Sequence, residues 1–318
     1  MENVKNGLYG FVIGDAMGVP IEFTGRVYDE SQKLKDMVGY GSHHVPAGTW
    51  SDDTSMTIAT MDSMQEKGGI DYCDIMDKFL AWATKSKYTN NGKLFDIGNT
   101  TSRALSKYMH NKDNPILCGE TGERSNGNGS LMRMLPIALY LYNKDYTEDE
   151  ELEIIKNISS LTHAHEISVM ACKIYVDYLK QIMSGNDKMD SYQEICKKDY
   201  NSFFSKETVD KYQKILSGKL QNESINNIVS SGYVISTLES VIWSILNTEN
   251  YEESIILSIN LGHDTDTIGA ITGSISGIMY GYESIPQRWL DELKGKDYLN
   301  KLIANFEELL TDGRNNYR

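Results

Sequence analysis

The chain has 318 residues, of which 40% are hydrophobic and 24% are charged, so it can bury a substantial core and is not globally disordered. Its 31 Lys and Arg against 45 Asp and Glu give a formal net charge of −14, which excludes a protein that holds nucleic-acid backbones by charge. A small anionic ligand stays possible, because metal ions and backbone N–H groups offset negative charge locally.

Apolar residues recur at helical spacing along the chain. Residues 72–83 and 164–183 each place apolar side chains on one face. Thr147, followed by three acidic residues, is typical of a capping box that opens another helix. No proline occurs between Pro136 and Pro286, which permits uninterrupted helices over that stretch. The sequence therefore predicts an all-α protein of roughly a dozen helices.

Two segments carry a glycine at every fourth residue, which on a helix lines one face with small residues. They are Gly10, Gly14 and Gly18 near the start and Gly269, Gly273, Gly277 and Gly281 near the end. Each helical glycine costs about 1 kcal/mol relative to alanine, so the repetition needs an explanation. Close packing of two helices and room for a ligand both provide one, and both stay open.

Domain boundaries are not marked in this sequence. No Pro/Ser-rich linker and no charge block divides the chain. Residues 184–230 are polar and rich in lysine, with turn signals at 184–187 and 217–218. We therefore expect one domain over residues 1–318, in which 184–230 is a peripheral helical insertion.

A first acidic motif stands immediately before a helical pattern and consists of Ser51, Asp52, Asp53 and Thr54. Such residues cap a helix by accepting its free backbone N–H groups, and carboxylates suit the positive end of the helix dipole. Two adjacent aspartates repel each other, however, and one hydroxyl is enough for a cap. Capping alone therefore leaves part of the motif unexplained.

A second motif of the same kind, Asp264 to Thr267, opens the glycine-lined helix near the end of the chain. Together the two motifs contain four carboxylates, whose charge balances two divalent cations. Carboxylate and hydroxyl oxygens suit Mg²⁺, and carboxylate sites also suit Mn²⁺. An EF-hand is excluded, because Ile268 and Ile275 stand where its oxygen ligands belong. We predict one metal site shared by the two helix starts.

Two further carboxylates lie at predicted junctions between loops and helices. Glu22 follows a proline at the end of the first glycine-lined segment, where a plain surface position is the ordinary interpretation. Asp96 opens residues 96–101, a pattern typical of a helix N-cap. Neither residue identifies a catalytic site by itself.

A Gly/Asn-rich loop and a histidine pair follow. Residues 125–133 run into an apolar helix, and such a loop either presents backbone N–H groups to a phosphate or makes a plain turn. His163 and His165 are two residues apart, and such a pair is structural, binds a metal or orients a carboxylate. Both interpretations of each motif stay open from these residues alone.

Six segments, in this order, resemble the ADP-ribosylglycohydrolase family, which includes dinitrogenase-reductase-activating glycohydrolases and ADP-ribosyl-acceptor hydrolases. They are GDAMGVPIEF (14–23), SDDT (51–54), DIGNTT (96–101), NGNGSLMRMLPIAL (126–139), THAHE (162–166) and GHDTDTIGAITGSISG (262–277). Each segment is weak evidence alone. Six segments in the family's order, in a resemblance that extends from residue 7 to about 281, are specific.

The resemblance implies a single compact, orthogonal all-α bundle around a cleft that holds two Mg²⁺ or Mn²⁺ ions. The implied metal ligands are Ser51, Asp52, Asp53, Asp264, Asp266 and Thr267. The family often has threonine where this chain has Ser51, and serine keeps the hydroxyl. Glu22 and Asp96 match catalytic positions. The implied substrate-binding residues are Asp15, Asn126, Gly127, Asn128, Gly129, Ser130 and His165.

The implied activity is hydrolysis of the glycosidic bond between ADP-ribose and an acceptor, with release of ADP-ribose. The acceptor would be a protein side chain or a small molecule, and cleavage would reverse mono-ADP-ribosylation. The ions would hold ribose hydroxyls and activate water, while carboxylates would stabilise an oxocarbenium-like transition state. Asp96 favours arginine as the acceptor. The sequence does not decide whether Glu22 or Asp96 is the principal acid or base.

Two other classes of function compete with this one. An HD-type metal phosphohydrolase is also all-α, and His263 with Asp264 supplies an HD pair, with His163 or His165 as the upstream histidine. That hypothesis leaves residues 51–54 and the Gly/Asn-rich loop unexplained. A non-catalytic ADP-ribose-binding relative is the second alternative, because folds outlive activities.

Cysteine content and hydropathy predict the cellular location. The four cysteines lie far apart and form no CxxC pair, so we expect free thiols in a reducing cytoplasm. The first residues lack a basic region that leads into an apolar one, so we expect no secretory signal peptide. No stretch approaches the roughly 20 apolar residues that span a bilayer, so we expect no membrane partner. The oligomeric state leaves no sequence signal.

Overall fold

A computed structural model describes residues 2–312, which form fourteen α-helices and no β-strand. The helices are α1 (Glu2–Gly18), α2 (Asp52–Lys67), α3 (Tyr72–Lys85), α4 (Asn99–His110), α5 (Leu135–Tyr142), α6 (Glu148–Ser160), α7 (Glu166–Met183), α8 (Lys188–Lys197), α9 (Lys206–Lys211), α10 (Val234–Leu246), α11 (Tyr251–Ile259), α12 (Thr265–Tyr280), α13 (Gln287–Glu292) and α14 (Lys296–Asp312). The all-α prediction is confirmed, with slightly more helices than expected.

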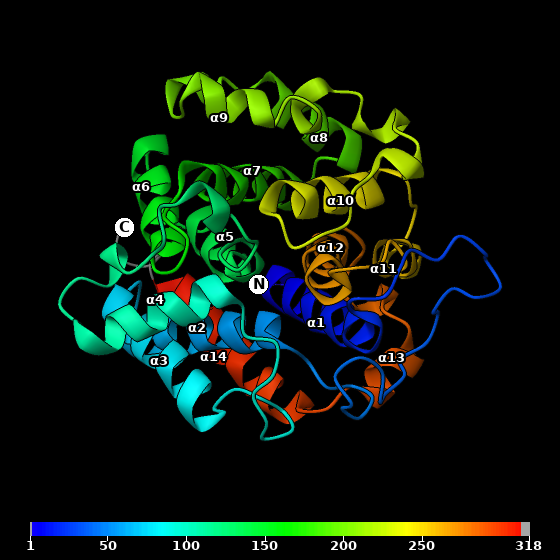
Figure 1. Cartoon of the computed structure of the whole chain (residues 1–318), viewed down its shortest axis with the longest axis horizontal. Helices are drawn as coiled ribbons and strands as arrows, with labels where there is room; N and C mark the ends of the chain where they lie inside the picture. Colours follow the sequence, from blue (N-terminus) through cyan, green and yellow to red (C-terminus); the bar gives the residue numbers. More distant parts are fainter. Residues whose placement is uncertain (1, 313–318) are drawn as a thin grey trace.

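Helices α1 and α12 lie side by side at the centre of the molecule, although they come from opposite ends of the chain (Figure 1). The glycine faces make this possible. A Cβ on Gly14 would lie 2.0 Å from the carbonyl oxygen of Gly269, and one on Gly10 would lie 2.2 Å from that of Gly273. The two backbones are thus in direct contact, which confirms close packing as the role of the glycines except Gly281, where a Cβ would meet no other described atom within 4 Å.

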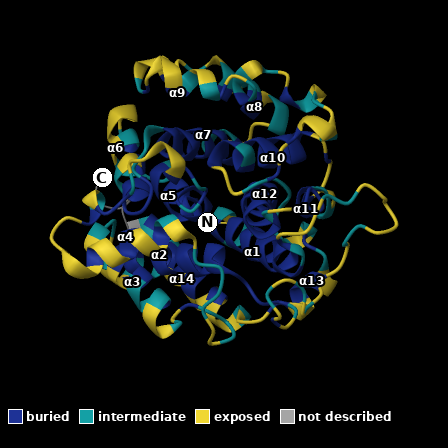
Figure 2. Ribbon diagram, viewed as in Figure 1, coloured by how far each residue is buried: buried dark blue, intermediate teal, exposed yellow. Residues whose placement is uncertain are grey.

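The helices that the sequence predicts most clearly are present. Helix α3 begins at Tyr72, and the apolar face of that segment is buried. Thr147 forms the predicted capping box with Glu150 at the start of α6. Buried apolar side chains from α1 to α14 form one continuous cluster, and α1, α5 and α12 are buried over most of their length (Figure 2). No helix among residues 2–312 is long and apolar enough to cross a membrane.

The polar stretch 184–230 contains α8 and α9, which lie along one edge of the molecule, over α7 (Figure 1). It is anchored to α7 by buried polar contacts. Tyr212 donates its hydroxyl to the carbonyl of Ile167 at 2.6 Å, and Lys198 forms an ion pair with Asp177 at 2.9 Å. Its description as an insertion into one domain stays a prediction.

Candidate active site

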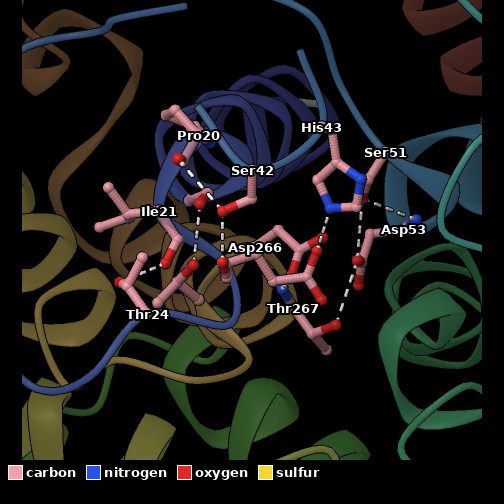
Figure 3. A network of polar contacts seen from close by, with 12 residues as sticks. Pro20, Ile21, Thr24, Ser42, His43, Ser51, Asp53, Asp266 and Thr267 are labelled. Atoms are coloured by element: carbon pink, nitrogen blue, oxygen red, sulfur yellow. Dashed lines mark hydrogen bonds and ion pairs between the residues drawn. The ribbon is translucent and has the colours of Figure 1, made fainter. Parts of the chain in front are cut away.

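The two acidic motifs meet in space. Ser51 is the N-cap residue of α2, and its hydroxyl donates to an Oδ2 atom of Asp53 at 3.1 Å. Thr267, in the first turn of α12, donates its hydroxyl to the same oxygen at 3.1 Å (Figure 3). The starts of α2 and α12 therefore form one site, as the sequence predicts. The contact follows from the packing of α1 against α12, which brings the start of α12 next to the end of α1.

Asp15, in the last turn of α1, holds the start of α2 in place. Its carboxylate accepts the backbone N–H groups of Ser51 and Thr54, each at 3.0 Å. Burial raises the pKa of Asp15 to about 6, although these hydrogen bonds oppose the shift. The side chain is fully buried and does not line the cleft described below. Its geometry supports a positioning role for the metal-site loop rather than the predicted contact with substrate.

The donor set fits hard divalent cations. The Oδ1 atom of Asp53 and the Oδ2 atom of Asp266 are buried and lack a hydrogen-bond partner among the described residues. Burial and repulsion between neighbouring carboxylates raise the pKa of Asp52, Asp53 and Asp266. Carboxylate oxygens also gather within 4.8 Å in three groups, which are Asp15–Asp53–Asp266, Asp52–Asp96–Asp266 and Glu22–Asp264–Asp266. Bound cations relieve both the missing contacts and the repulsion.

This acidic site opens into a cleft of about 660 Å³. Its walls come from the loops that precede α2, α4, α5, α7, α10 and α12, from α4, and from the first turns of α2 and α12. The lining residues are Glu22, Phe23, Asp52, Asp96, Gly98, Asn99, Thr100, Thr101, Arg103, Arg124, Gly127, Asn128, Gly129, Met132, His163, Ser231, Gly232, His263, Asp264 and Thr267. The cleft is acidic at the helix starts, and two arginines are its only Lys or Arg residues.

Glu22 and Asp96 come together at the acidic end. One carboxylate oxygen of each lies within 4.8 Å of the other, and burial with repulsion from Asp96, Asp264 and Asp53 raises the pKa of Glu22 to about 10. His43 contacts Glu22 through its Nε2 atom, and burial lowers the pKa of His43. Burial thus favours the neutral form of both side chains. Sequence reasoning missed His43, because nothing in the segment around it marks a site.

Asp96 is not the N-cap residue that its motif suggests. Helix α4 begins three residues later, with Gly98 as its N-cap and no side-chain cap. Asp96 instead has a φ of 59°, which is uncommon for a residue other than glycine. This backbone conformation belongs to the loop before α4, and it places Asp96 in the wall of the cleft.

The Gly/Asn-rich loop supplies one wall, but only part of it faces the cleft. Gly127, Asn128 and Gly129 line it, and a Cβ on Gly129 would lie 2.8 Å from the His163 ring. The other two predicted residues point into the protein. Asn126 is bound to Ser168, and the hydroxyl of Ser130 accepts a hydrogen bond from Ser159 at 2.9 Å. These two side chains support the loop, whereas direct contact with substrate has no support from their positions.

His163 lines the cleft, whereas the predicted His165 does not. His165 is the N-cap residue of α7, where its Nδ1 atom accepts the N–H of Ile167 at 3.2 Å. Burial, with the nearby charges of Arg133 and Arg103, lowers the pKa of His163 to about 3. The HxH motif therefore marks the correct segment, but the helix start turns the second histidine away from the site.

Comparisons with known proteins agree with this geometry. The sequence profile described as ADP-ribosylglycohydrolase matches residues 1–316. The chain is 30% identical to the ADP-ribosylarginine hydrolase Tri1 of Serratia proteamaculans, over 95% of this chain and 78% of that protein. It is 28% identical to the ADP-ribosyl-[dinitrogen reductase] glycohydrolase of Rhodospirillum rubrum, over 90% of this chain and 88% of that one.

A solved structure shares the fold. A chain of an "ADP-ribosylglycohydrolase-related protein complex" superposes with a TM-score of 0.80 at 26% sequence identity, over 97% of this chain and 98% of that one. The profile match spans nearly the whole sequence, and the motifs that carry it converge on one acidic cleft. The chain belongs to the ADP-ribosylglycohydrolase family.

Proposed function

We propose that this protein is a metal-dependent hydrolase that cleaves the glycosidic bond between ADP-ribose and an acceptor and releases ADP-ribose. The observation that carries the proposal is the meeting of two acidic helix starts at one end of a cleft whose other walls carry glycine N–H groups and arginines. The diphosphate of ADP-ribose would bind to those walls, and its distal ribose would bind at the acidic end. The substrate would be an ADP-ribosylated protein or a small-molecule conjugate.

The predicted ligands Ser51, Asp52, Asp53, Asp264, Asp266 and Thr267 would hold two Mg²⁺ or Mn²⁺ ions. When bound, such ions would supply contacts to vicinal ribose hydroxyls and a lowered pKa for water at the site. Asp15 keeps the start of α2 in place for this purpose. Asn128 orients Asp264, because its Nδ2 atom donates to the Oδ2 atom of that carboxylate at 2.6 Å.

The Glu22–Asp96 pair is suited to proton transfer at the acidic end. Both side chains line the cleft, and one carboxylate oxygen of each lies within 4.8 Å of the other. One carboxyl of such a pair keeps a proton that it donates to the departing acceptor, and the other stays ionised. The negative charge of the pair also stabilises an oxocarbenium-like transition state.

The diphosphate would lie along the wall that the Gly/Asn-rich loop and the two arginines form. Gly127 and Gly129 offer backbone N–H groups there, and Arg103 and Arg124 supply positive charge. Arg103 is already held by Glu120 at 3.2 Å. Arg124 is exposed and has no hydrogen bond or ion pair with any described residue, so it is free to bind an anion.

An arginine acceptor fits the site best, so the reaction would reverse mono-ADP-ribosylation of arginine. A guanidinium carries positive charge and planar N–H donors, which a pair of carboxylates matches. Two of the similar proteins are named for ADP-ribosylarginine and ADP-ribosylated dinitrogen reductase. We also propose a cytoplasmic location, because a reducing compartment suits the four cysteines, all of which are free.

The alternatives have less support. Among residues 2–312, no group of potential metal ligands includes His163 or His263, which an HD-type phosphohydrolase would need. Release of inorganic phosphate from nucleotides would revive that alternative. A binding protein without activity would bind ADP-ribose tightly in a calorimeter and turn over no conjugate.

The acceptor is identified by presenting purified enzyme and Mg²⁺ or Mn²⁺ with a matched panel of ADP-ribose conjugates. The panel contains conjugates of arginine and serine, O-acetyl-ADP-ribose, poly(ADP-ribose) and an ADP-ribosylated base, and free ADP-ribose is quantified by chromatography. We expect the fastest release from the arginine conjugate. If ADP-ribose were released from another conjugate alone, that conjugate would identify the acceptor in place of arginine. Release from none of them would contradict the proposed function.

A further inference from the structure

Phe23, directly after Glu22, has an exposed side chain at the edge of the cleft. Its side chain is 70% exposed, although it lines the cleft. Its φ of 63° lies in the left-handed region, where a bulky side chain is a true outlier. Burial of the ring does not offset this strain, since most of the ring contacts solvent. Strained residues of this kind cluster at functional sites.

The strain comes from a reciprocal backbone contact with the second metal-site motif. Phe23 donates its N–H to the carbonyl of His263 at 2.6 Å, and His263 donates its N–H to the carbonyl of Thr24 at 2.7 Å. His263 is also left-handed, with a φ of 64°. The two segments therefore hold each other, which fixes the backbone of Phe23 beside the second acidic motif.

Aromatic rings continue behind Phe23. The ring of His43 lies 5.7 Å from that of Phe23, at an interplanar angle of 56°. The ring of Phe95 lies 4.9 Å from that of His43, at 41°. In the chain, Glu22 directly precedes Phe23, and Asp96 directly follows Phe95. The exposed ring of Phe23 thus stands near two carboxylates that also line the cleft.

We propose that Phe23 determines acceptor specificity by stacking its ring on the guanidinium of the acceptor arginine. A guanidinium is planar, weakly hydrated and attracted to an aromatic face, while its N–H groups reach the neighbouring carboxylates. A neutral acceptor such as serine gains nothing from this face. The inference rests on the proposed function with an arginine acceptor.

A matched control residue is present in the same chain. Tyr40 has a φ of 60° and a side chain that is 71% exposed, so it shares the strain and exposure of Phe23. It is not among the residues that line the cleft. Glycine at either position relieves the left-handed strain, so neither variant loses stability through its backbone.

The experiment compares Phe23→Gly, Phe23→Trp and Tyr40→Gly with the unsubstituted enzyme in the presence of Mg²⁺ or Mn²⁺. Steady-state kinetics on ADP-ribosyl-agmatine, whose acceptor carries the guanidinium of arginine, measure recognition of the acceptor. Calorimetry with ADP-ribose measures binding of the other half of the substrate. Thermal unfolding checks that each variant is folded. We expect Phe23→Gly to raise KM about tenfold, the size of a partly desolvated cation–π contact. We expect Phe23→Trp to keep the original KM, and neither variant to change the Kd of ADP-ribose.

Each other result is decisive. An unchanged KM in Phe23→Gly, or an equal rise in Tyr40→Gly, would overturn the inference while the proposed function stands. Weaker binding of ADP-ribose to Phe23→Gly would show that the ring contacts the ADP-ribose half of the substrate, and this result would also overturn the inference. An unsubstituted enzyme that does not cleave ADP-ribosyl-agmatine would contradict the arginine acceptor itself, and the inference would fail with it.

Discussion

Glu22 and Asp96, the proposed catalytic pair, are both loop residues. Neither is held by a regular element, since Glu22 ends the 3₁₀ turn after α1 and Asp96 precedes α4. Carboxylate oxygens of the two residues lie within 4.8 Å of each other, close enough for the pair to act as a unit, and His43 is a further contact of Glu22. A unit of this kind loses its function when either member changes.

The first prediction concerns that unit. Glu22→Gln and Asp96→Asn should each lower kcat by about 100-fold or more, because each replaces a carboxyl group that the proposed proton transfer needs. The double variant should lose little beyond the stronger single variant, since residues that act as a unit are not additive. The metal content of each variant, measured by elemental analysis, shows whether a lower kcat reflects lost proton transfer or lost metal binding. Full activity in both single variants would show that the pair does not transfer the proton.

Arg124 carries the second prediction. Arg124→Ala should weaken ADP binding about tenfold and leave adenosine binding unchanged, because only ADP presents a diphosphate to the guanidinium. Calorimetry with the two ligands measures this difference. Arg124→Lys should recover part of the loss, and Lys156→Ala, on the exposed side of α6, should cause none. Equal losses for ADP and adenosine would place Arg124 outside the diphosphate wall.

The sequence indicates the acidic residues of the site but not every residue that faces the cleft. Carboxylate pairs at helix starts are visible as motifs, so the residues from Ser51 to Asp53 could be predicted. The direction in which a loop side chain points is not visible in the sequence, so His163 lines the cleft in place of the predicted His165. His43 and Arg124 carried no signal at all, because each reaches the site only through the path of an irregular loop.

At the scale of elements, the pair α1–α12 determines the site. Backbone contact between Gly14 and Gly269 places the ends of both helices where Asp15 and Asp266 meet. A wider side chain at the contact must push the helices apart. The acidic site would separate with them.

Gly14→Ala tests this directly. Its Cβ would lie 2.0 Å from a backbone carbonyl oxygen that cannot move alone, so we expect a loss of about 3 kcal/mol or more in the free energy of unfolding. Chemical denaturation measures the loss. Gly25→Ala is the matched control, since its Cβ meets open space. A change below about 1 kcal/mol in Gly14→Ala would show that the helices pack less tightly than described.

Helix positions were the most predictable part of the fold. Segments such as 72–83 carry a full apolar face, and the 3.6-residue period indicates their structure without tertiary information. The glycines at every fourth residue predicted two helices but not that these helices pack on each other, because a face of small residues suits close helix packing and a ligand cavity equally. Asp96 was misleading for the opposite reason: a capping motif predicts a helix start, whereas α4 begins after it.

At the scale of the whole molecule, the negative charge concentrates where metal is expected. In the metal-free protein, burial raises the pKa of Asp15 to about 6 and that of Glu22 to about 10, and it raises the pKa of Asp53 and Asp266 as well. These groups keep protons in the folded protein at pH values where the unfolded chain has lost them. Stability of the metal-free protein therefore falls as pH rises above the ordinary carboxyl value of about 4.

A thermal unfolding series tests this dependence between pH 6.5 and 8.5. His163 does not interfere there, because a lowered pKa destabilises the fold only below the ordinary histidine value of about 6.5. We expect the unfolding midpoint of EDTA-treated protein to fall across this range, and Mg²⁺ or Mn²⁺ to raise it more at pH 8.5 than at pH 6.5. A midpoint that is flat with pH and unaffected by either ion would argue against the buried carboxylate site.

The most direct measurement is release of free ADP-ribose from ADP-ribosyl-arginine by the purified protein, with Mg²⁺ or Mn²⁺ and again with EDTA. Asp266→Ala, which removes the carboxylate common to all three acidic groups, is measured beside it. Metal-dependent release that disappears in EDTA and in Asp266→Ala is the predicted result. Release that persists in EDTA and in the variant would contradict a metal-dependent hydrolase.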